Sequence, residues 1–192
     1  MRELETHRLV IRPFTTDDLD AYAGLMDASF DRLIERAKDL DAYRERLSFF
    51  ALGERVLADL RLPPYTDRAV ALKETGRLIG SVGFVPCLAP FSQFPFFGGT
   101  KDAKFSPEVG LFYAIAPEHR RHGFASEAVA AMVRFAFDEL KLLRVVATTW
   151  YDNAASAAVM RRIGMTVQHN PWPTPPWFQV VGVLENLTPP GG

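Results

Sequence analysis

The chain has 192 residues, 48% hydrophobic and 23% charged, a composition that excludes disordered and fibrous classes. Its formal net charge of −1 excludes a general attraction to nucleic acid or anionic membranes, so any anion site must be local. The single cysteine excludes an internal disulfide and indicates a reducing compartment. The charged N-terminal segment is unlike a signal peptide, and no apolar run reaches membrane-spanning length. We therefore expect one cytoplasmic domain over residues 1–192, with no nucleic-acid or membrane partner.

The first part of the chain predicts a strand, a helical region and a hairpin. The alternating segment HRLVIRPF predicts a strand over residues 7–14. Residues 16–62 are typical of helix, with an acidic first turn in TTDDLDAY, and Pro63 and Pro64 end this region. The two β-like runs RAVALKET and RLIGSVGFV follow, and Gly76 between them predicts a hairpin.

Residues 86–107 form a long segment rich in phenylalanine, proline and glycine, with neither helical nor alternating pattern. Segments of this length inside a domain are usually functional or disordered. The phenylalanines argue against permanent disorder. We expect a flexible flap over a pocket, with a packed surface loop or a dimer contact as the alternatives.

The second part of the chain alternates strands and helices. EVGLFYAIA predicts a strand that must stop before Pro117, and apolar residues at three- and four-residue spacing predict a helix over residues 123–140. The remaining predicted elements are a strand over 142–150, a short helix in 151–165 that Asp152 or Asn153 could cap and Gly164 could end, and a closing strand over 177–186.

The segment PEHRRHGFASEAV lies at the turn from a strand into a helix. The first turn of a helix has unpaired N–H groups, and the peptide dipoles favour negative charge there. Gly123 allows a ligand to approach the backbone, and Ala125 keeps the next inward position small. The flanking donors are His119, Arg120, Arg121 and His122. This arrangement suits a pyrophosphate. A metal site on the two histidines is the alternative, but suitably spaced further ligands are lacking nearby, so we expect no metal.

Strand, turn and helix together resemble the acetyl-CoA-binding motif of the GNAT superfamily of N-acetyltransferases, whose pattern Q/R-x-x-G-x-G/A matches Arg120 to Ala125. Segments similar to the Rim-type ribosomal-protein N-terminal acetyltransferases follow in order: ETHRLVIRPFTTDD, PEVGLFYAIAPEHR, SEAVAAMVRFAF and YDNAASAAVMRRIGM. The resemblance is weakest between Phe30 and Tyr65 and in the 86–107 segment. It implies an α/β fold with a mixed, mostly antiparallel central sheet flanked by helices, and a splayed strand pair that admits acyl-CoA. Residues 16–62 would then be the acceptor side and 108–165 the acyl-CoA core.

The resemblance also implies roles for individual residues. The backbone around Ile115 would pair with the pantetheine arm of acetyl-CoA, and Asn153 would contact that arm near the thioester or serve only as a helix cap. Ser156 would contact the leaving sulfur or only pack the helix. The pyrophosphate would be held by Arg120, Arg121, His122, Gly123, Phe124, Ala125 and Ser126. At position 121 this branch often has a second glycine, and the arginine could add a phosphate contact.

The acyl transfer requires a neutral amine, and a primary amine is mostly protonated at pH 7. We expect Glu108 to act as the base, through a water, with a salt bridge or an anchor for the substrate ammonium as alternatives. Many relatives have a tyrosine that protonates the leaving thiolate, but the corresponding residue here is Met160. Ser156, Tyr113 or solvent could supply that proton instead.

The acceptor is expected to be a primary amine, on a protein N-terminus or on a small molecule. Two groups of side chains could select it: the acidic set Asp27, Asp31, Glu35, Asp39 and Asp41, and the aromatic set Phe94, Phe96, Phe97, Trp172 and Trp177. The acidic set could equally be a solvated helix face, and the aromatic set core or dimer contacts. A catalytically weak acyl-CoA sensor and a phosphate-binding interaction domain are the alternative functions, and a homodimer is the default assembly.

Overall fold

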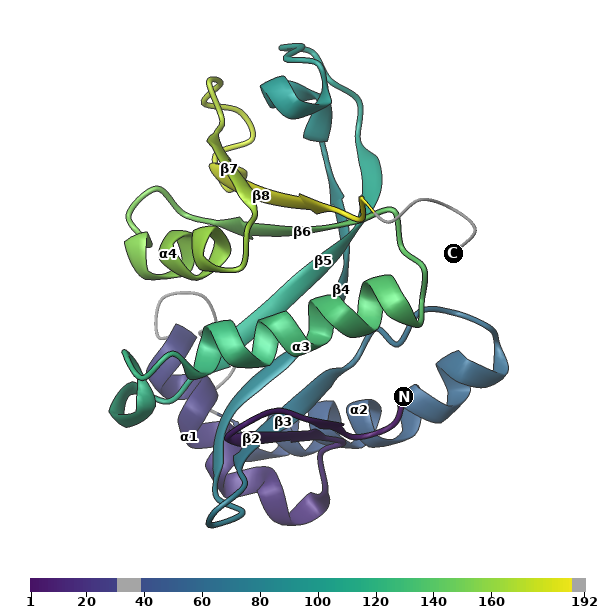
Figure 1. The fold of residues 1–192 in the computed structure, drawn as a ribbon, viewed down its shortest axis with the longest axis vertical. Coiled ribbons are helices and arrows are strands. Elements are labelled where there is room, and N and C mark those ends of the chain that lie inside the picture. Colours follow the sequence, from purple (N-terminus) through teal and green to yellow (C-terminus); the bar gives the residue numbers. More distant parts are fainter. Residues whose placement is uncertain (31–38, 188–192) are drawn as a thin grey trace. The chain divides into compact units, whose positions relative to one another are not determined.

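The computed structural model describes residues 1–30 and 39–187, and its strands form one eight-stranded, mostly antiparallel sheet flanked by helices (Figure 1). The strands are β1 (Leu4–Glu5), β2 (Leu9–Arg12), β3 (Asp67–Leu72), β4 (Leu78–Ala89), β5 (Ser106–Ile115), β6 (Arg144–Thr149), β7 (Thr166–His169) and β8 (Val180–Glu185). Their order in the sheet is β1-β2-β3-β4-β5-β6-β8-β7, and the β5–β6 pair is parallel. The predicted fold class is confirmed.

The contacts divide the chain into two units, which we describe separately. Unit 1 comprises Met1–Val85 and Phe112–Met132, and unit 2 comprises Pro86–Leu111 and Val133–Gly192. Strands β4 and β5 and the helix α3 (Phe124–Asp138) contribute residues to both units.

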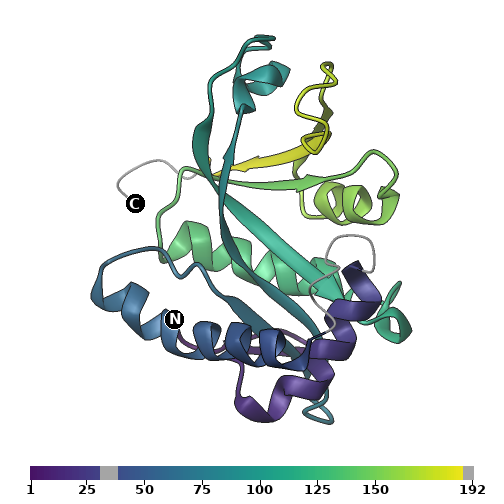
Figure 2. The same ribbon diagram turned by 180° about the vertical axis from the view of Figure 1, so that it is seen from behind.

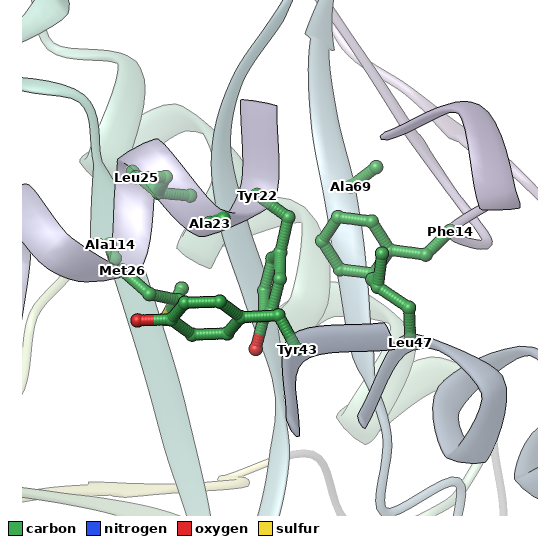
Figure 3. Close-up of a cluster of buried hydrophobic side chains, with 9 residues drawn as sticks. All are labelled: Phe14, Tyr22, Ala23, Leu25, Met26, Tyr43, Leu47, Ala69 and Ala114. Atoms are coloured by element: carbon green, nitrogen blue, oxygen red, sulfur yellow. The ribbon is translucent and has the colours of Figure 1, made fainter. Parts of the chain in front are cut away.

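In unit 1, β2, β3 and β4 form an antiparallel sheet with the predicted hairpin at Gly76, whose φ of 69° is left-handed. The helices α1 (Leu19–Phe30) and α2 (Leu40–Asp59) lie on one face of these strands, and the first turns of α3 lie on the other (Figure 1, Figure 2). The core under α1 and α2 contains Phe14, Tyr22, Ala23, Leu25, Met26, Tyr43, Leu47, Ala69 and Ala114 (Figure 3).

The start of α1 is fixed by a buried carboxylate. Asp18 accepts hydrogen bonds from two guanidinium nitrogens of Arg12, at 2.7 and 2.8 Å, and from the backbone N–H of Thr15 at 2.8 Å. Burial alone would raise the pKa of Asp18, but the bonds from Arg12 and Thr15 outweigh it and lower that pKa. The acidic first turn predicted from TTDDLDAY therefore joins β2 to α1.

In unit 2, β8 pairs antiparallel with both β6 and β7, and the helix α4 (Ala154–Arg162) follows β6. A cluster of buried aromatic and aliphatic residues, which we call the phenylalanine cluster, packs on these strands. It contains Ala89, Phe91, Phe94, Val146, Phe178, Val181 and Val183. The Phe178 ring meets those of Phe91 and Phe94 edge-on, with centroids 5.2 and 5.0 Å apart.

The structure differs from the predicted elements in several places. The helical region 16–62 is a 3₁₀ turn followed by α1 and α2, and residues 31–38 lie outside the described part. The segment 86–107 is partly strand, because β4 continues to Ala89 and β5 begins at Ser106. Between these strands, Phe91 and Phe94 are fully buried. This burial agrees with the alternative interpretation of the segment as a packed surface loop. The short strands β1 and β7 were not predicted.

Candidate active site

The turn before α3 has the backbone geometry of an anion site. Gly123 and Arg121 both adopt left-handed conformations, with φ of 81° and 65°. The N–H of Glu127 donates to the carbonyl of Gly123 at 3.0 Å, which is a regular helical bond. The N–H groups of residues 124–126 come before this first helical bond, so the carbonyls four positions earlier lie outside the helix. These N–H groups are directed out of the N-terminal end of α3, where the helix dipole favours an anion.

The basic side chains of the turn divide into two kinds. Arg120 folds back onto the end of β5, because its Nε donates to the carbonyl of Ile115 at 2.9 Å and its Nη2 to Ser29 Oγ at 3.3 Å. Arg121 and His122 are exposed. The His122 ring stacks on that of Phe124 with centroids 5.8 Å apart. Of the predicted donors, Arg120 thus holds the turn in place, while Arg121 and His122 surround it.

Glu127 connects the first turn of α3 to the turn between β1 and β2, a feature that the sequence did not reveal. Its carboxylate accepts hydrogen bonds from Thr6 Oγ1 at 2.6 Å and from the backbone N–H and Nε of Arg8, both at 2.8 Å. Although burial raises the pKa of Glu127, these bonds outweigh it and lower that pKa. The Arg8 guanidinium also lies 4.3 Å from the centroid of the Phe124 ring. The helix start that carries the anion site is therefore held in place by several contacts.

At Ile115, the backbone N–H and carbonyl groups of β5 point away from β4. The N–H of Ala116 donates to the carbonyl of Ile79 on β4 at 2.9 Å, and the carbonyl of Ala114 faces Gly80. Because backbone polar groups alternate along a strand, the N–H and carbonyl of Ile115 point the other way. The carbonyl is the acceptor for Arg120, so the N–H is the group that an extended ligand could bond.

Asn153 is the N-cap of α4 in unit 2. Its Oδ1 accepts the N–H of Ser156 at 3.0 Å, so the predicted helix cap is present. This bond fixes the orientation of the amide and leaves its Nδ2 group as the donor toward solvent. Ser156 is half-buried on α4.

Met160 is fully buried, and its Sδ lies 2.9 Å from the position a Cβ on Gly182 would take. Met160 is therefore a core residue with no proton to give a thiolate.

Glu108 on β5 forms a two-point ion pair with Arg144 on β6, both in unit 2. Nε and Nη2 of Arg144 donate to its two carboxylate oxygens at 2.9 and 2.5 Å. The Glu108 side chain is only 9% exposed, and its hydrogen bonds raise the pKa of Arg144. Burial and the Glu108 charge also raise the pKa of the nearby Cys87 thiol to about 11, so this cysteine is protonated at neutral pH. The salt bridge that was one alternative for Glu108 is thus present.

The predicted site residues are distributed over the two units. Unit 1 contains Ile115 and the turn from Arg120 to Ser126, and unit 2 contains Glu108, Asn153 and Ser156. In the described part of the chain, no group of His, Cys, Asp or Glu side chains could hold a metal ion. None of the described helices is long and apolar enough to cross a membrane.

The residues suggested to select the acceptor have mixed environments. Asp27 accepts a hydrogen bond from Tyr43 Oη at 2.6 Å, and Asp39 caps α2 by accepting the N–H of Asp41 at 3.0 Å. Asp31 and Glu35 lie outside the described residues. In the aromatic set Phe94 is a core residue, whereas Trp177 is 46% exposed.

Comparison with known proteins adds to this geometry. Residues 8–166 match the family model described as an acetyltransferase (GNAT) domain. The Bacillus subtilis protein named uncharacterized N-acetyltransferase YoaA is 27% identical over 164 residues, covering 84% of this chain and 81% of its own. The crystal structure of an acetyltransferase from Agrobacterium tumefaciens matches with a TM-score of 0.68 and 25% identity, over 96% of this chain and 95% of that one. The structure of Mycobacterium smegmatis RimJ in complex with CoA-disulfide has a TM-score of 0.64 at 16% identity, over 96% and 85%.

Proposed function

The chain belongs to the GNAT acetyltransferase family, and from this premise we propose that it moves an acetyl group from acetyl-CoA to a primary amine by direct attack on the thioester. The observation that carries the proposal is the turn before α3, where left-handed backbone at Arg121 and Gly123 opens the helix start to an anion. The match to the family model runs through both units, and we propose that residues 1–192 act as one acetyltransferase domain.

The proposed binding of acetyl-CoA uses separate groups for separate parts of the molecule. The amides of residues 124–126 accept the pyrophosphate, and Arg121 and His122 add donors around it. The N–H of Ile115 bonds a carbonyl of the pantetheine arm. The Nδ2 group of Asn153 donates to another acceptor on that arm, because its Oδ1 already caps α4. The complex of RimJ with a CoA-disulfide supports this choice of cosubstrate.

The proposed reaction exchanges one acyl bond for another. The neutral amine nitrogen attacks the acetyl carbon, the new C–N bond forms, and the C–S bond breaks to give the CoA thiolate. The nitrogen loses its proton to a base, and the thiolate takes one from solvent or from a hydroxyl such as that of Ser156, since Met160 has none. The acceptor is a small-molecule amine or a protein N-terminus. A need for acetyl-CoA and the single cysteine favour the cytoplasm as the location.

A thiol-release assay tests the proposal. Purified protein and acetyl-CoA are mixed with a panel of amines and short basic peptides, and free CoA is measured. Release with one class of acceptor supports the transferase and identifies the acceptor class. A rise in melting temperature with acetyl-CoA but no release across the panel would favour the acyl-CoA sensor. No stabilisation by acetyl-CoA would contradict both.

Substitution of Glu108 by glutamine separates the roles proposed for this residue. As a base, Glu108 should contribute about 100-fold to turnover, and its loss should flatten the pH profile while acetyl-CoA affinity stays unchanged. The exposed Glu185, which also lies near Arg144, provides the matched control as Glu185→Gln. Turnover equal to wild type in Glu108→Gln would remove the base role and leave Glu108 as the partner of Arg144.

A further inference from the structure

Helix α2 in unit 1 has a row of exposed apolar side chains in addition to the side chains that it packs against the strands. We propose that this row binds the same row on a second copy of the chain, with the two α2 helices antiparallel. The proposed contact lies within unit 1, and it does not depend on the proposed acetyl transfer.

The exposed apolar residues of α2 follow helical spacing. Phe49, Leu52, Val56 and the C-cap Leu60 are three or four positions apart, so they line one side of the helix. Their exposed fractions lie between 49% and 63%. Single exposed leucines are ordinary on a protein surface, but a continuous row of large apolar side chains marks an interaction site. We call this row the α2 stripe.

The α2 stripe is separate from the side of the helix that packs on the strands, over which α2 lies in Figure 2. The buried residues of α2 are Tyr43, Leu47 and Gly53, and Phe50 packs against the same core. Because a helix turns once in about 3.6 residues, Leu52 lies roughly half a turn away from Tyr43 and Phe50. The helix is therefore apolar on two sides, and the described part of unit 1 covers one of them.

The charged residues beside the α2 stripe have both signs. The four exposed residues there are Glu45, Arg46, Arg55 and Asp59, two acidic and two basic. Such a mixed border gives no attraction to an anionic membrane, to nucleic acid or to a strongly charged protein. Since the four charges cancel, two copies of the same surface can approach each other without net repulsion. The charge pattern therefore favours a second copy over a charged partner.

The size of the α2 stripe fits the interface of a dimer. At these exposed fractions the four side chains present about 400 Å² of apolar area, with about 200 Å² as the full area of phenylalanine and less for leucine and valine. Two copies would bury about 800 Å² of apolar area, which corresponds to about 1,200 Å² in total when about 65% of a homodimer interface is apolar. This total exceeds the roughly 1,000 Å² that a specific interface requires. We expect a dimer that dissociates on dilution.

A row of side chains along one helix can pair with itself about a two-fold axis. In such a contact, a first residue of one copy meets a second residue of the other copy, and the reverse pair forms as well. In the antiparallel arrangement Leu52 meets Val56 of the second copy. Phe49 then meets Leu60 of the second copy, because both pairs are centred near Glu54. Every residue of the stripe has an apolar partner, so one axis accounts for the whole surface.

Analytical ultracentrifugation of the purified chain tests this interface. We expect wild type to sediment in the micromolar range with twice the 21.5 kDa mass of one chain. Leu52→Glu should raise the Kd of the dimer about 100-fold, because each copy would bring a carboxylate into the apolar contact. Ala51→Glu is the matched control, since it adds the same charge at an exposed position about 100° further around the same helix. This control should dimerise as wild type does.

The outcomes of this experiment are distinct. A wild type that stays monomeric in the micromolar range would overturn the proposal and leave the α2 stripe to a different protein. A dimer that withstands Leu52→Glu, or equal dissociation of both variants, would overturn it too. Residues 51 and 52 are exposed, so both variants should keep the wild-type melting temperature at concentrations where wild type is monomeric. That measurement separates loss of the interface from loss of the fold.

A mixing experiment identifies the occupant as a second copy. One variant has Leu52→Glu with Val56→Glu, and the other has Leu52→Lys with Val56→Lys. Each alone should be monomeric through repulsion of like charges, whereas their equimolar mixture should form a one-to-one dimer, because opposite charges then meet in both symmetric pairs. A mixture that stays monomeric, or dimerisation of either variant alone, would contradict the antiparallel pairing of the two α2 helices.

Discussion

Replacement of Gly123 by valine should weaken acetyl-CoA binding about 100-fold. Gly123 has a φ of 81°, a conformation that β-branched residues strongly disfavour, and it lies directly before the amides that would hold the pyrophosphate. A valine side chain would keep the phosphates from those amides. Loss of two hydrogen bonds to a charged group, each contributing about 1.5 kcal/mol, corresponds to that change in Kd. Isothermal titration with acetyl-CoA measures it.

Gly76→Val is the matched control for this substitution. Gly76 has a φ of 69° at the hairpin between β3 and β4, and no atom of residues 1–30 or 39–187 lies within 4 Å of a Cβ added there. The two variants should therefore lose similar stability through backbone strain, while only the change at Gly123 affects acetyl-CoA. Equal affinities in two folded variants would mean that the turn before α3 is not the pyrophosphate site.

Replacement of Gly80 by alanine should have the largest effect on stability. A Cβ at position 80 would lie 2.5 Å from the carbonyl oxygen of Ala114 and 2.6 Å from Ile115 Cδ1. The backbone atom cannot rotate away, so β4 and β5 would have to separate where Ile115 is presented. We expect a loss of about 3 kcal/mol in the free energy of unfolding, measured by urea denaturation.

Gly24→Ala provides the opposite case in the same unit. Gly24 lies within α1, and among the described residues no atom lies within 4 Å of its added Cβ. Alanine should stabilise this helix by about 0.5–1 kcal/mol, because glycine has greater freedom in the unfolded chain. If Gly80→Ala were as stable as Gly24→Ala, the close pairing of β4 with β5 described here would be wrong.

The sequence predicted those elements that are determined by residues close together in the chain. The hairpin at Gly76 is confirmed, and Asn153 is confirmed as the cap of α4. The short strands β1 and β7 have two and four residues, too few for an alternating pattern to be read, and they form through pairing with β2 and β8. The roles of Glu108, Ser156 and the pyrophosphate donors stay predictions.

The polar contacts that the sequence did not reveal join residues far apart in the chain. Glu108 and Arg144 are 36 positions apart, and Thr6 and Glu127 are 121 apart. Asp67 follows a proline-containing turn, where an aspartate usually indicates only the end of a loop. Asp67 on β3 interacts with the charge of Arg46 on α2 and with the hydroxyl of Ser81 on β4 only after these elements have packed together.

The left-handed backbone at Arg121 has a consequence for protein engineering. A residue other than glycine loses about 1 kcal/mol in this conformation, a cost that glycine avoids. Glycine at position 121 should make the unliganded protein easier to produce and store, but it would remove an exposed guanidinium beside the start of α3. Glycine at this position would therefore favour a more stable enzyme, whereas arginine would favour stronger binding of nucleotide-like anions.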